Sequence, residues 1–288
     1  MELDFLVTVL LSSLSSASIL LIATLGLAVV YGLMGVINLA HGEFLMVGAY
    51  SALTATQIGL PFVLAIPFAV AMTMLIGAIV ELLIIRRLYG RIFDTMLATW
   101  GLGMVFNQMA VLLFGTVTPG IGMPQWNFKI GDYSLAVYPI AMIGVAAAML
   151  IFAYFLMTKT VYGMKARASI QQPEMAQAIG IDSSRVNTLT FAIGCGLAGF
   201  AGAILVPIIP ATPSMGLFFA VKGFLVVVVA GPVAITGTAM TALGLGGGAS
   251  ITASFMTSVI GDVFFFLITA LLLWLYPRGI SSKWRRKL

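Results

Sequence analysis

The sequence predicts an all-α integral membrane protein, a polytopic helical bundle of eight or nine transmembrane segments. Of its 288 residues, 61% are apolar and 8% are charged, whereas about a quarter of the residues of a soluble domain carry charge. Four stretches, 44–80, 95–128, 186–221 and 223–261, contain no Asp, Glu, Lys or Arg. Each is long enough to cross a bilayer, which takes roughly 20 apolar residues. A water-soluble globule is therefore excluded.

The whole chain, residues 1–288, is predicted to form a single membrane domain. The longest polar stretch, Lys159–Arg185, is too short to bury a core of its own. Cys195 is the only cysteine, which excludes an intrachain disulfide and a cysteine metal cluster. With one histidine and scattered acids, the sequence predicts neither a metal site nor a bound cofactor.

The distribution of basic residues predicts the orientation. Twelve of the fourteen Lys and Arg residues fall into three groups, and the positive-inside rule places all three in the cytoplasm. The groups are Arg86, Arg87 and Arg91; Lys159, Lys165, Arg167 and Arg185; and Arg278, Lys283, Arg285, Arg286 and Lys287. An odd number of crossings before the first group puts the N-terminus outside and the C-terminus in the cytoplasm.

The predicted crossings follow from the apolar stretches between these groups. Three precede Arg86, two lie between the first and second groups, and four follow Arg185, at 5–29, 33–56, 62–85, 95–115, 135–157, 186–208, 217–236, 238–258 and 261–277. Eight is the rival count, because Gly231-Pro232 and Gly244–Gly248 predict broken or half-spanning helices. The outer loop, Pro119–Tyr133, carries Trp126 at interfacial depth.

Polar residues interrupt the apolar sequence most conspicuously at Gly32–Gly48, which holds Asn38, His41 and Glu43 among four glycines. Polar groups inside a membrane need partners. One interpretation is that His41 and Glu43 lock two helices together by buried hydrogen bonds while glycines allow close packing. The other is that these side chains, or backbone exposed at a helix break, face a passing polar solute.

Two further patterns involve small residues. Thr99, Gly103 and Asn107 recur every four residues and therefore share one helix face, which suits either a pore wall or a helix contact. The run Gly194–Gly202 has small residues three and four apart, a pattern that favours close helix packing.

The longest predicted cytoplasmic loop, about 159–185, contains a short helix. Pro173 suits a first helical position, Glu174 suits the first turn, and Gly180 suits the stop. The helix would expose Met175 and Ile179, an apolar pair four residues apart, either to a groove on a partner protein or to the bilayer surface.

The chain lacks the Gly-x-x-x-x-Gly-Lys-Ser/Thr loop that cradles nucleotide phosphates, so it is not expected to hydrolyse ATP itself. No nucleophile and base can be paired convincingly, so we do not expect an enzyme. Any ATP-driven work would need another subunit.

The sequence resembles the permease subunits of the branched-chain amino acid class of bacterial ABC importers over nearly its whole length. The resemblance rests on Gly26–Tyr50, with Gly35-Val-Ile-Asn-Leu-Ala-His-Gly42, on Gly163–Gly180, and on Asn187–Gly202. Within that class, Leu88–Gly101 looks most like the urea permeases. The chain departs from the family's glycine-rich pattern at Ala230–Gly237, so the local geometry there is not carried over.

The resemblance implies a multi-pass protein of the bacterial inner membrane that works with several partners. They are a second homologous permease, two cytoplasmic ATPases that bind ATP, and a periplasmic substrate-binding protein. The cytoplasmic loop would then hold the coupling helix seated in the ATPase, formed by Pro173, Glu174, Met175, Ala178, Ile179 and Gly180. Asn38, His41, Glu43, Thr99 and Asn107 are the candidates for the substrate pathway.

The leading hypothesis from the sequence is ATP-driven uptake of urea or a similar short amide. A zwitterionic amino acid would favour a charge pair or helix ends facing its carboxylate and ammonium. We expect Lys222 at an interface, which leaves the membrane interior almost without basic residues. The alternatives are a branched-chain amino acid permease, and a channel or secondary transporter that works without ATPases and uses His41 and Glu43 as proton sites.

Overall fold

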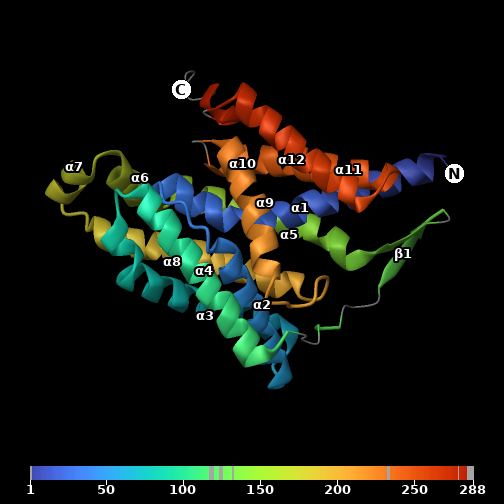
Figure 1. Cartoon of the computed structure of the whole chain (residues 1–288), viewed down its shortest axis with the longest axis horizontal. Helices are drawn as coiled ribbons and strands as arrows, with labels where there is room; N and C mark the ends of the chain where they lie inside the picture. The colour runs from blue at the N-terminus through green and yellow to red at the C-terminus, as the bar shows by residue number, and fades with distance from the viewer. Residues whose placement is uncertain are drawn as a thin grey trace.

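The structure, a computed structural model, describes residues 2–116, 120–122, 126–131, 133–231, 234–277 and 279–283. Helices make up nearly all of it, with one short β-hairpin (Figure 1). The elements are α1 (Glu2–Met34), α2 (His41–Gln57), α3 (Phe62–Leu83), η1 (Ile85–Leu88), α4 (Ile92–Phe114), β1 (Asn127–Ile130), β2 (Tyr133–Ala136), α5 (Val137–Lys159), α6 (Val161–Gln171), α7 (Pro173–Ala178), α8 (Ser183–Leu205), α9 (Met215–Ala230), α10 (Ala234–Thr241), η2 (Ala242–Gly246), α11 (Gly247–Phe255), α12 (Ser258–Leu275) and η3 (Ile280–Lys283).

An all-α polytopic membrane protein is confirmed, but the predicted count of eight or nine crossings is too high. Within the described residues, six helices are long and apolar enough to cross a bilayer: α1, α3, α4, α5, α8 and α12. The stretch 33–56 is not a full crossing because α1 continues to Met34 and leaves a helix of 17 residues. At 1.5 Å per residue, α2 is about 26 Å long, shorter than the roughly 30 Å hydrocarbon core.

The predicted crossings at 217–236 and 238–258 are also not two straight spans. The helix α9 and the stretch from Ile235 to Phe255 form a pair bent by 116°, which gives a seventh span if counted as one. Gly231 ends α9 with a φ of +81°, and the glycine-rich stretch that follows contains η2, one turn of π-helix. Pro232 lies outside the described residues.

The helix α8 is the centre of the bundle and the most deeply buried of the spans. Its glycines let three other helices pack closely: a Cβ at Gly194 would overlap the Val30 side chain of α1, one at Gly199 would overlap the Thr73 side chain of α3, and one at Gly202 would overlap the carbonyl oxygen of Leu45 in α2. The packing role predicted for Gly194–Gly202 is therefore confirmed.

The loop after α4 contains structure that the sequence did not reveal. The strands β1 and β2 pair antiparallel, with Ile130 opposite Tyr133, and Gly131 turns with a φ of +56° beside Asp4. Trp126 is exposed, as predicted for the loop. Residues 117–119, 123–125 and 132 of this loop lie outside the described residues.

The start of α1 and the helix α7 lie at opposite ends of the longest axis of the molecule (Figure 1). The turn that carries Arg86 and Arg91 lies beside α6, α7 and the start of α8, because residues from all of these line one pocket. The first two basic groups therefore share one end of the bundle. Their assignment to the cytoplasm, and that of the C-terminal group, stays a prediction.

We predict that Gly202→Ala lowers the free energy of unfolding by about 1–3 kcal/mol, the usual cost of overpacking. The new methyl group would overlap the backbone of α2. The measurement is the midpoint of thermal unfolding in mild detergent. The control is Gly144→Ala in α5, where a Cβ would have no neighbour within 4 Å. Equal midpoints for the two variants would contradict the packing account.

Candidate functional site

The polar motif of the sequence forms the entry to α2, where the chain turns after α1. Gly35 ends α1 with a φ of +64°. Asn38 is buried, and its Oδ1 accepts a hydrogen bond of 3.1 Å from the backbone N–H of Ala40. Glu43 lies in the first turn of α2, where a carboxylate is favourable to the helix dipole.

His41 joins α2 to α1. Its buried ring places Nε2 3.1 Å from the carbonyl oxygen of Ala23. Because a carbonyl oxygen only accepts, Nε2 carries the proton. The ring also packs against Gly26, where a Cβ would come too close to it. This hydrogen bond and the close packing join α2 to α1, as in the interpretation that His41 locks two helices together. The partner of His41 is the α1 backbone and not Glu43.

Glu43 is the one acidic residue of the motif, whose other polar side chains each leave one buried nitrogen without a partner among the described residues, Asn38 Nδ2 and His41 Nδ1. It is 6% exposed, and its Oε2 has no hydrogen-bond partner among the described residues. Its carboxylate fills the space of a missing side chain at Gly216 of α9, and its Cγ faces Gly103 of α4. A buried carboxylate without a partner is costly. Such a group inside a membrane protein is a candidate for contact with a polar solute.

The small-residue face of α4 packs onto this motif. Thr99 Oγ1 accepts a hydrogen bond of 3.1 Å from the N–H of Leu39, and Asn107 Nδ2 donates one of 2.7 Å to the carbonyl oxygen of Pro213 before α9. Gly103 lies between them against Glu43. The predicted shared face therefore exists and is used for helix contact. The predicted pathway residues His41, Thr99 and Asn107 thus each bond to another segment, at Ala23 of α1, at Leu39 before α2 and at Pro213 before α9.

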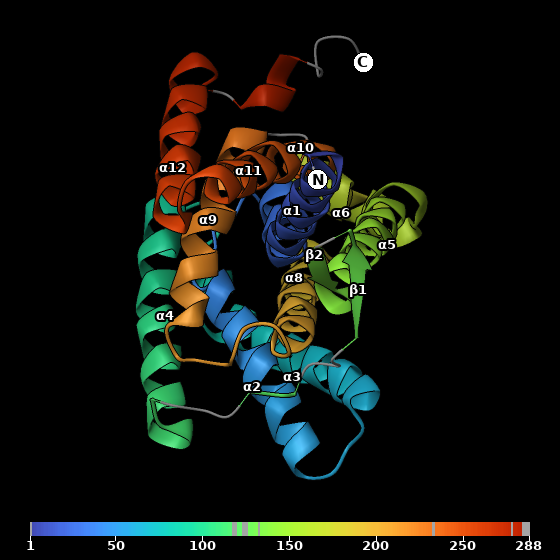
Figure 2. The same ribbon diagram turned by 90° about the vertical axis from the view of Figure 1, so that its right-hand side faces the viewer.

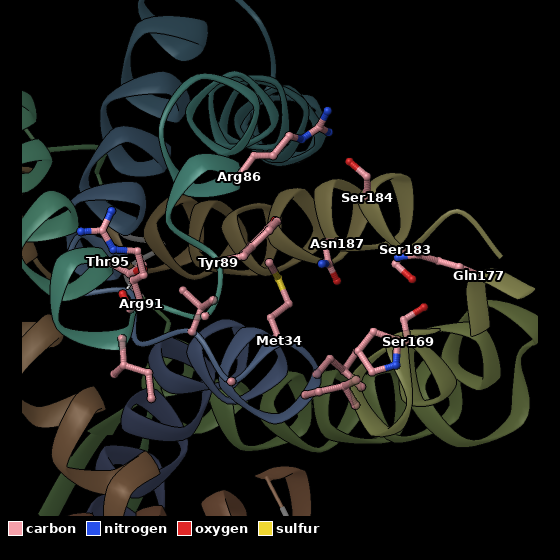
Figure 3. A pocket seen from close by; sticks show the side chains of 17 residues that line it. Met34, Arg86, Tyr89, Arg91, Thr95, Ser169, Gln177, Ser183, Ser184 and Asn187 are labelled. Atoms are coloured by element: carbon pink, nitrogen blue, oxygen red, sulfur yellow. Dashed lines mark hydrogen bonds between the residues drawn. The ribbon is translucent and has the colours of Figure 1, made fainter. Parts of the chain in front are cut away.

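A pocket of about 680 Å³ opens between the end of α1, the α3–α4 turn and the helices α6 to α8 (Figure 3). Asn187 and Ser183, four residues apart on α8, and Ser169 of α6 lie on its wall. The hydroxyl oxygens of both serines are buried and have no hydrogen-bond partner in the described part of the chain. Such groups suit a hydrated pocket. Sequence reasoning did not find this pocket, because its wall comes from four separated segments.

A buried network fixes the turn above this pocket. Glu81 is 0% exposed; its carboxylate accepts a hydrogen bond from the Tyr89 hydroxyl and lies 3.4 Å from Arg86 Nη2. The same nitrogen donates a hydrogen bond of 2.7 Å to Thr188 of α8. Burial, followed by the hydrogen bond and negative charge of Glu81, raises the pKa of the Tyr89 hydroxyl, which therefore stays a donor. The network joins α3, the turn and α8.

The predicted cytoplasmic helix is α7. Pro173 is its first residue, and Gly180 follows it with a φ of +84°. Ile181 N–H bonds to Ala176 O and Gly180 N–H to Gln177 O, the pair of bonds that closes a helix of this kind. Met175 is 65% exposed and Ile179 76%, so the apolar pair does project outward.

The helix α6, which precedes α7, was not predicted from the sequence. The side chain of Thr160 caps it by accepting a bond from Gly163 N–H. The available signal for the start of α6 was Thr160, because threonine is a favoured N-cap residue and Val161 follows it as the first helical residue. The loop of about 159–185 is therefore two consecutive helices and not one helix in a polar segment.

A charge pair between α9 and α12 is the main feature that sequence reasoning missed. Lys222 Nζ of α9 lies 2.7 Å from Asp262 Oδ1 of α12. Lys222 lies near the middle of α9, and its expected place at a membrane interface stays a prediction. The two residues lie at the two ends of the charge-free stretch 223–261. This pattern marks them as isolated charges, but it does not indicate that they contact each other. Among the described residues, no three His, Cys, Asp or Glu side chains form a group that could hold a metal ion.

Comparison with known proteins gives matches over almost the whole chain. The profile of the family described as "Branched-chain amino acid transport system / permease component" matches residues 9–276. The chain is 29% identical over 300 residues to the high-affinity branched-chain amino acid transport system permease protein BraD of Pseudomonas aeruginosa, covering 95% of each.

Two other relatives carry related descriptions. The chain is 25% identical to the high-affinity branched-chain amino acid transport system permease protein LivH of Escherichia coli K12, over 90% of each chain. It is also 25% identical to the probable branched-chain amino acid transport permease protein LivH of Methanocaldococcus jannaschii, over 94% of this chain and 91% of the relative. No solved structure matches significantly.

We predict that Asn107→Leu destabilises the fold by about 1–3 kcal/mol, because it leaves the carbonyl oxygen of Pro213 without its donor. The helix α4 is the least buried of the candidate spans, so few other contacts compensate. The measurement is thermal unfolding of the purified chain. Gln108→Leu, which removes an exposed amide from the next position, should leave the midpoint unchanged. A loss of similar size in both variants would contradict this role of Asn107.

Proposed function

The chain belongs to the family of permease components of branched-chain amino acid transport systems, and we propose that it is the membrane-spanning permease of an ATP-driven importer for branched-chain amino acids. The observation that carries this proposal is the family match over residues 9–276, together with relatives of that description that align end to end with the chain. Urea, the leading hypothesis from the sequence, has no support among these relatives.

The structure removes one argument that favoured a neutral solute. That argument rested on a membrane interior almost without basic residues, yet Lys222 is 16% exposed at its side chain and paired with Asp262. A charge pair is what a zwitterion needs along its path. An amino acid with a carboxylate and an ammonium group is therefore compatible with this interior.

The partners in this proposal are two cytoplasmic ATPases, a second permease and a substrate-binding protein on the outer side. The exposed apolar pair Met175 and Ile179 on α7 supports docking to an ATPase, since a short helix with an apolar face fits a groove on another protein. The chain itself would hydrolyse no ATP and would be a multi-pass protein of the bacterial inner membrane.

The test of this function begins with the tagged chain purified from its native membranes in mild detergent, with its copurifying subunits identified by mass spectrometry. We expect two ATPase chains and a second permease. Reconstituted with ATP and the binding protein, the assembly should take up radiolabelled leucine and not radiolabelled urea. ATP-dependent uptake of urea, without uptake of leucine, would contradict this proposal and identify urea as the substrate.

A chain recovered without partners, which transports solute along a pH gradient, would instead favour the secondary-transporter alternative. In that case Glu43→Gln should abolish transport, because His41 and Glu43 would be the proton sites. This outcome would contradict the importer proposal altogether.

We predict that Met175→Asp with Ile179→Asp uncouples the permease from the ATPase, since two carboxylates would replace the apolar surface of α7. Copurification of the ATPase and leucine uptake should both fall at least tenfold, with an unchanged unfolding temperature. The control is Ile58→Asp, equally exposed on the predicted outer side. Normal ATPase recovery in the double variant would contradict the coupling role of α7.

A further inference from the structure

The pair of Lys222 and Asp262 connects the middle of α9 to the second turn of α12. The distance between Nζ and Oδ1 is 2.7 Å, and the side chains are 16% and 47% exposed. Both residues lie within segments that are apolar enough to cross the membrane. The lysine is therefore nearly enclosed, whereas the carboxylate remains open on one side.

Two aromatic rings complete the surroundings of the lysine. The ammonium lies 4.3 Å from the centroid of the Phe218 ring and 5.6 Å from that of Phe265. A cation at such distances is attracted by the negative face of the ring. Lys222 thus keeps favourable surroundings for its charge even when Asp262 engages another cation.

The pair lies on the outward side of α9. Gly216 and Gly223 face the bundle, against Glu43 and Thr24 respectively. Phe218 and Lys222 are four residues apart and share a different face, next to the exposed apolar residue Val221. Figure 2 shows α9, α12 and α4 along one edge of the bundle. The charges are thus isolated on an otherwise apolar, outward-facing surface.

A half-exposed carboxylate on such a face is unfavourable against lipid. Ionisable side chains within membrane segments face the protein interior or a water-filled cavity, and they mark the paths of substrates and ions. The face of α9 and α12 around Asp262 therefore borders an aqueous route. In an importer with two permeases, a route of this kind would run between the two subunits.

We propose that Lys222 binds the carboxylate, and Asp262 the ammonium group, of the amino acid that passes along this route. This proposal rests on the proposed function. When the route is empty, the two side chains satisfy each other, which limits the cost of burying them. A zwitterion exchanges that one ion pair for two, with no net change of charge, whereas a neutral amide offers neither partner. Phe218 and Val221 supply apolar surface for the aliphatic side chain.

The experiment measures the maximal rate of leucine uptake by the reconstituted importer at saturating binding protein. Lys222→Gln and Asp262→Asn should each lower the rate at least tenfold. The decisive variant is the double replacement Lys222→Met with Asp262→Leu, because exchanging both members of a buried ion pair for apolar residues commonly preserves or raises stability. The matched control is Lys129→Gln in β1, an exposed lysine remote from α9.

A structural pair and a binding pair give opposite results in the double variant. We expect an unfolding temperature at least equal to that of the wild type, with uptake still reduced at least tenfold. Recovery of wild-type uptake, or an unchanged rate in both single variants, would overturn the proposal while the importer function stands. Failure of the wild-type assembly to take up any leucine would instead overturn the proposed function, and this inference with it.

Discussion

The close packing of three neighbouring helices against the glycines of α8 is the constraint on which the rest of the structure depends. In a bilayer the lipid tails are as apolar as leucine, so helices associate through close packing and hydrogen bonds. Gly194, Gly199 and Gly202 provide that packing toward α1, α3 and α2 respectively. The position of α2 follows from it, and so does the placement of Asn38, His41 and Glu43 at its first turn.

This arrangement separates two kinds of polar residue. His41, Thr99 and Asn107 each bond to a backbone group of a neighbouring segment, and these bonds hold α1, α2, α4 and α9 together. Glu43 and the Lys222–Asp262 pair carry carboxylates instead: Glu43 Oε2 has no hydrogen-bond partner among the described residues, and Asp262 is partly open. Both adjoin α9, which makes this helix the element around which the candidate route is organised.

Much of the fold could be predicted because apolar stretches and basic clusters are local signals. The predicted crossing at 62–85 coincides with α3, and that at 186–208 is displaced by only three residues from α8. The prediction of a crossing at 33–56 was wrong, because hydropathy does not show that α1 continues past Gly32 to Met34. The shared face of α4 followed from spacing alone, whereas its partners Leu39 and Pro213 depend on tertiary packing.

The charged sites were less predictable for the same reason. Glu81 is buried against Tyr89 and Arg86, partners that its sequence neighbourhood does not identify. Lys222 and Asp262 are 40 residues apart, and only the fold of α9 and α12 brings them together. The pairing of Lys222 with Asp262 also alters the substrate inference, since two opposite charges on apolar helices suit a zwitterion better than the sequence alone indicated.

The central claim is that the outward face of α9 borders water and not lipid. Its most direct test is thiol accessibility in the assembled importer, with Cys195 replaced by alanine. A thiol reacts through its thiolate, which forms only where water reaches it. We expect Val221→Cys to react with a water-soluble, membrane-impermeant thiol reagent, while Ile151→Cys on α5, an apolar position that is 68% exposed against 42% for Val221, stays unmodified. If Val221→Cys is as inert as Ile151→Cys, this face is covered by lipid or protein and the account is contradicted.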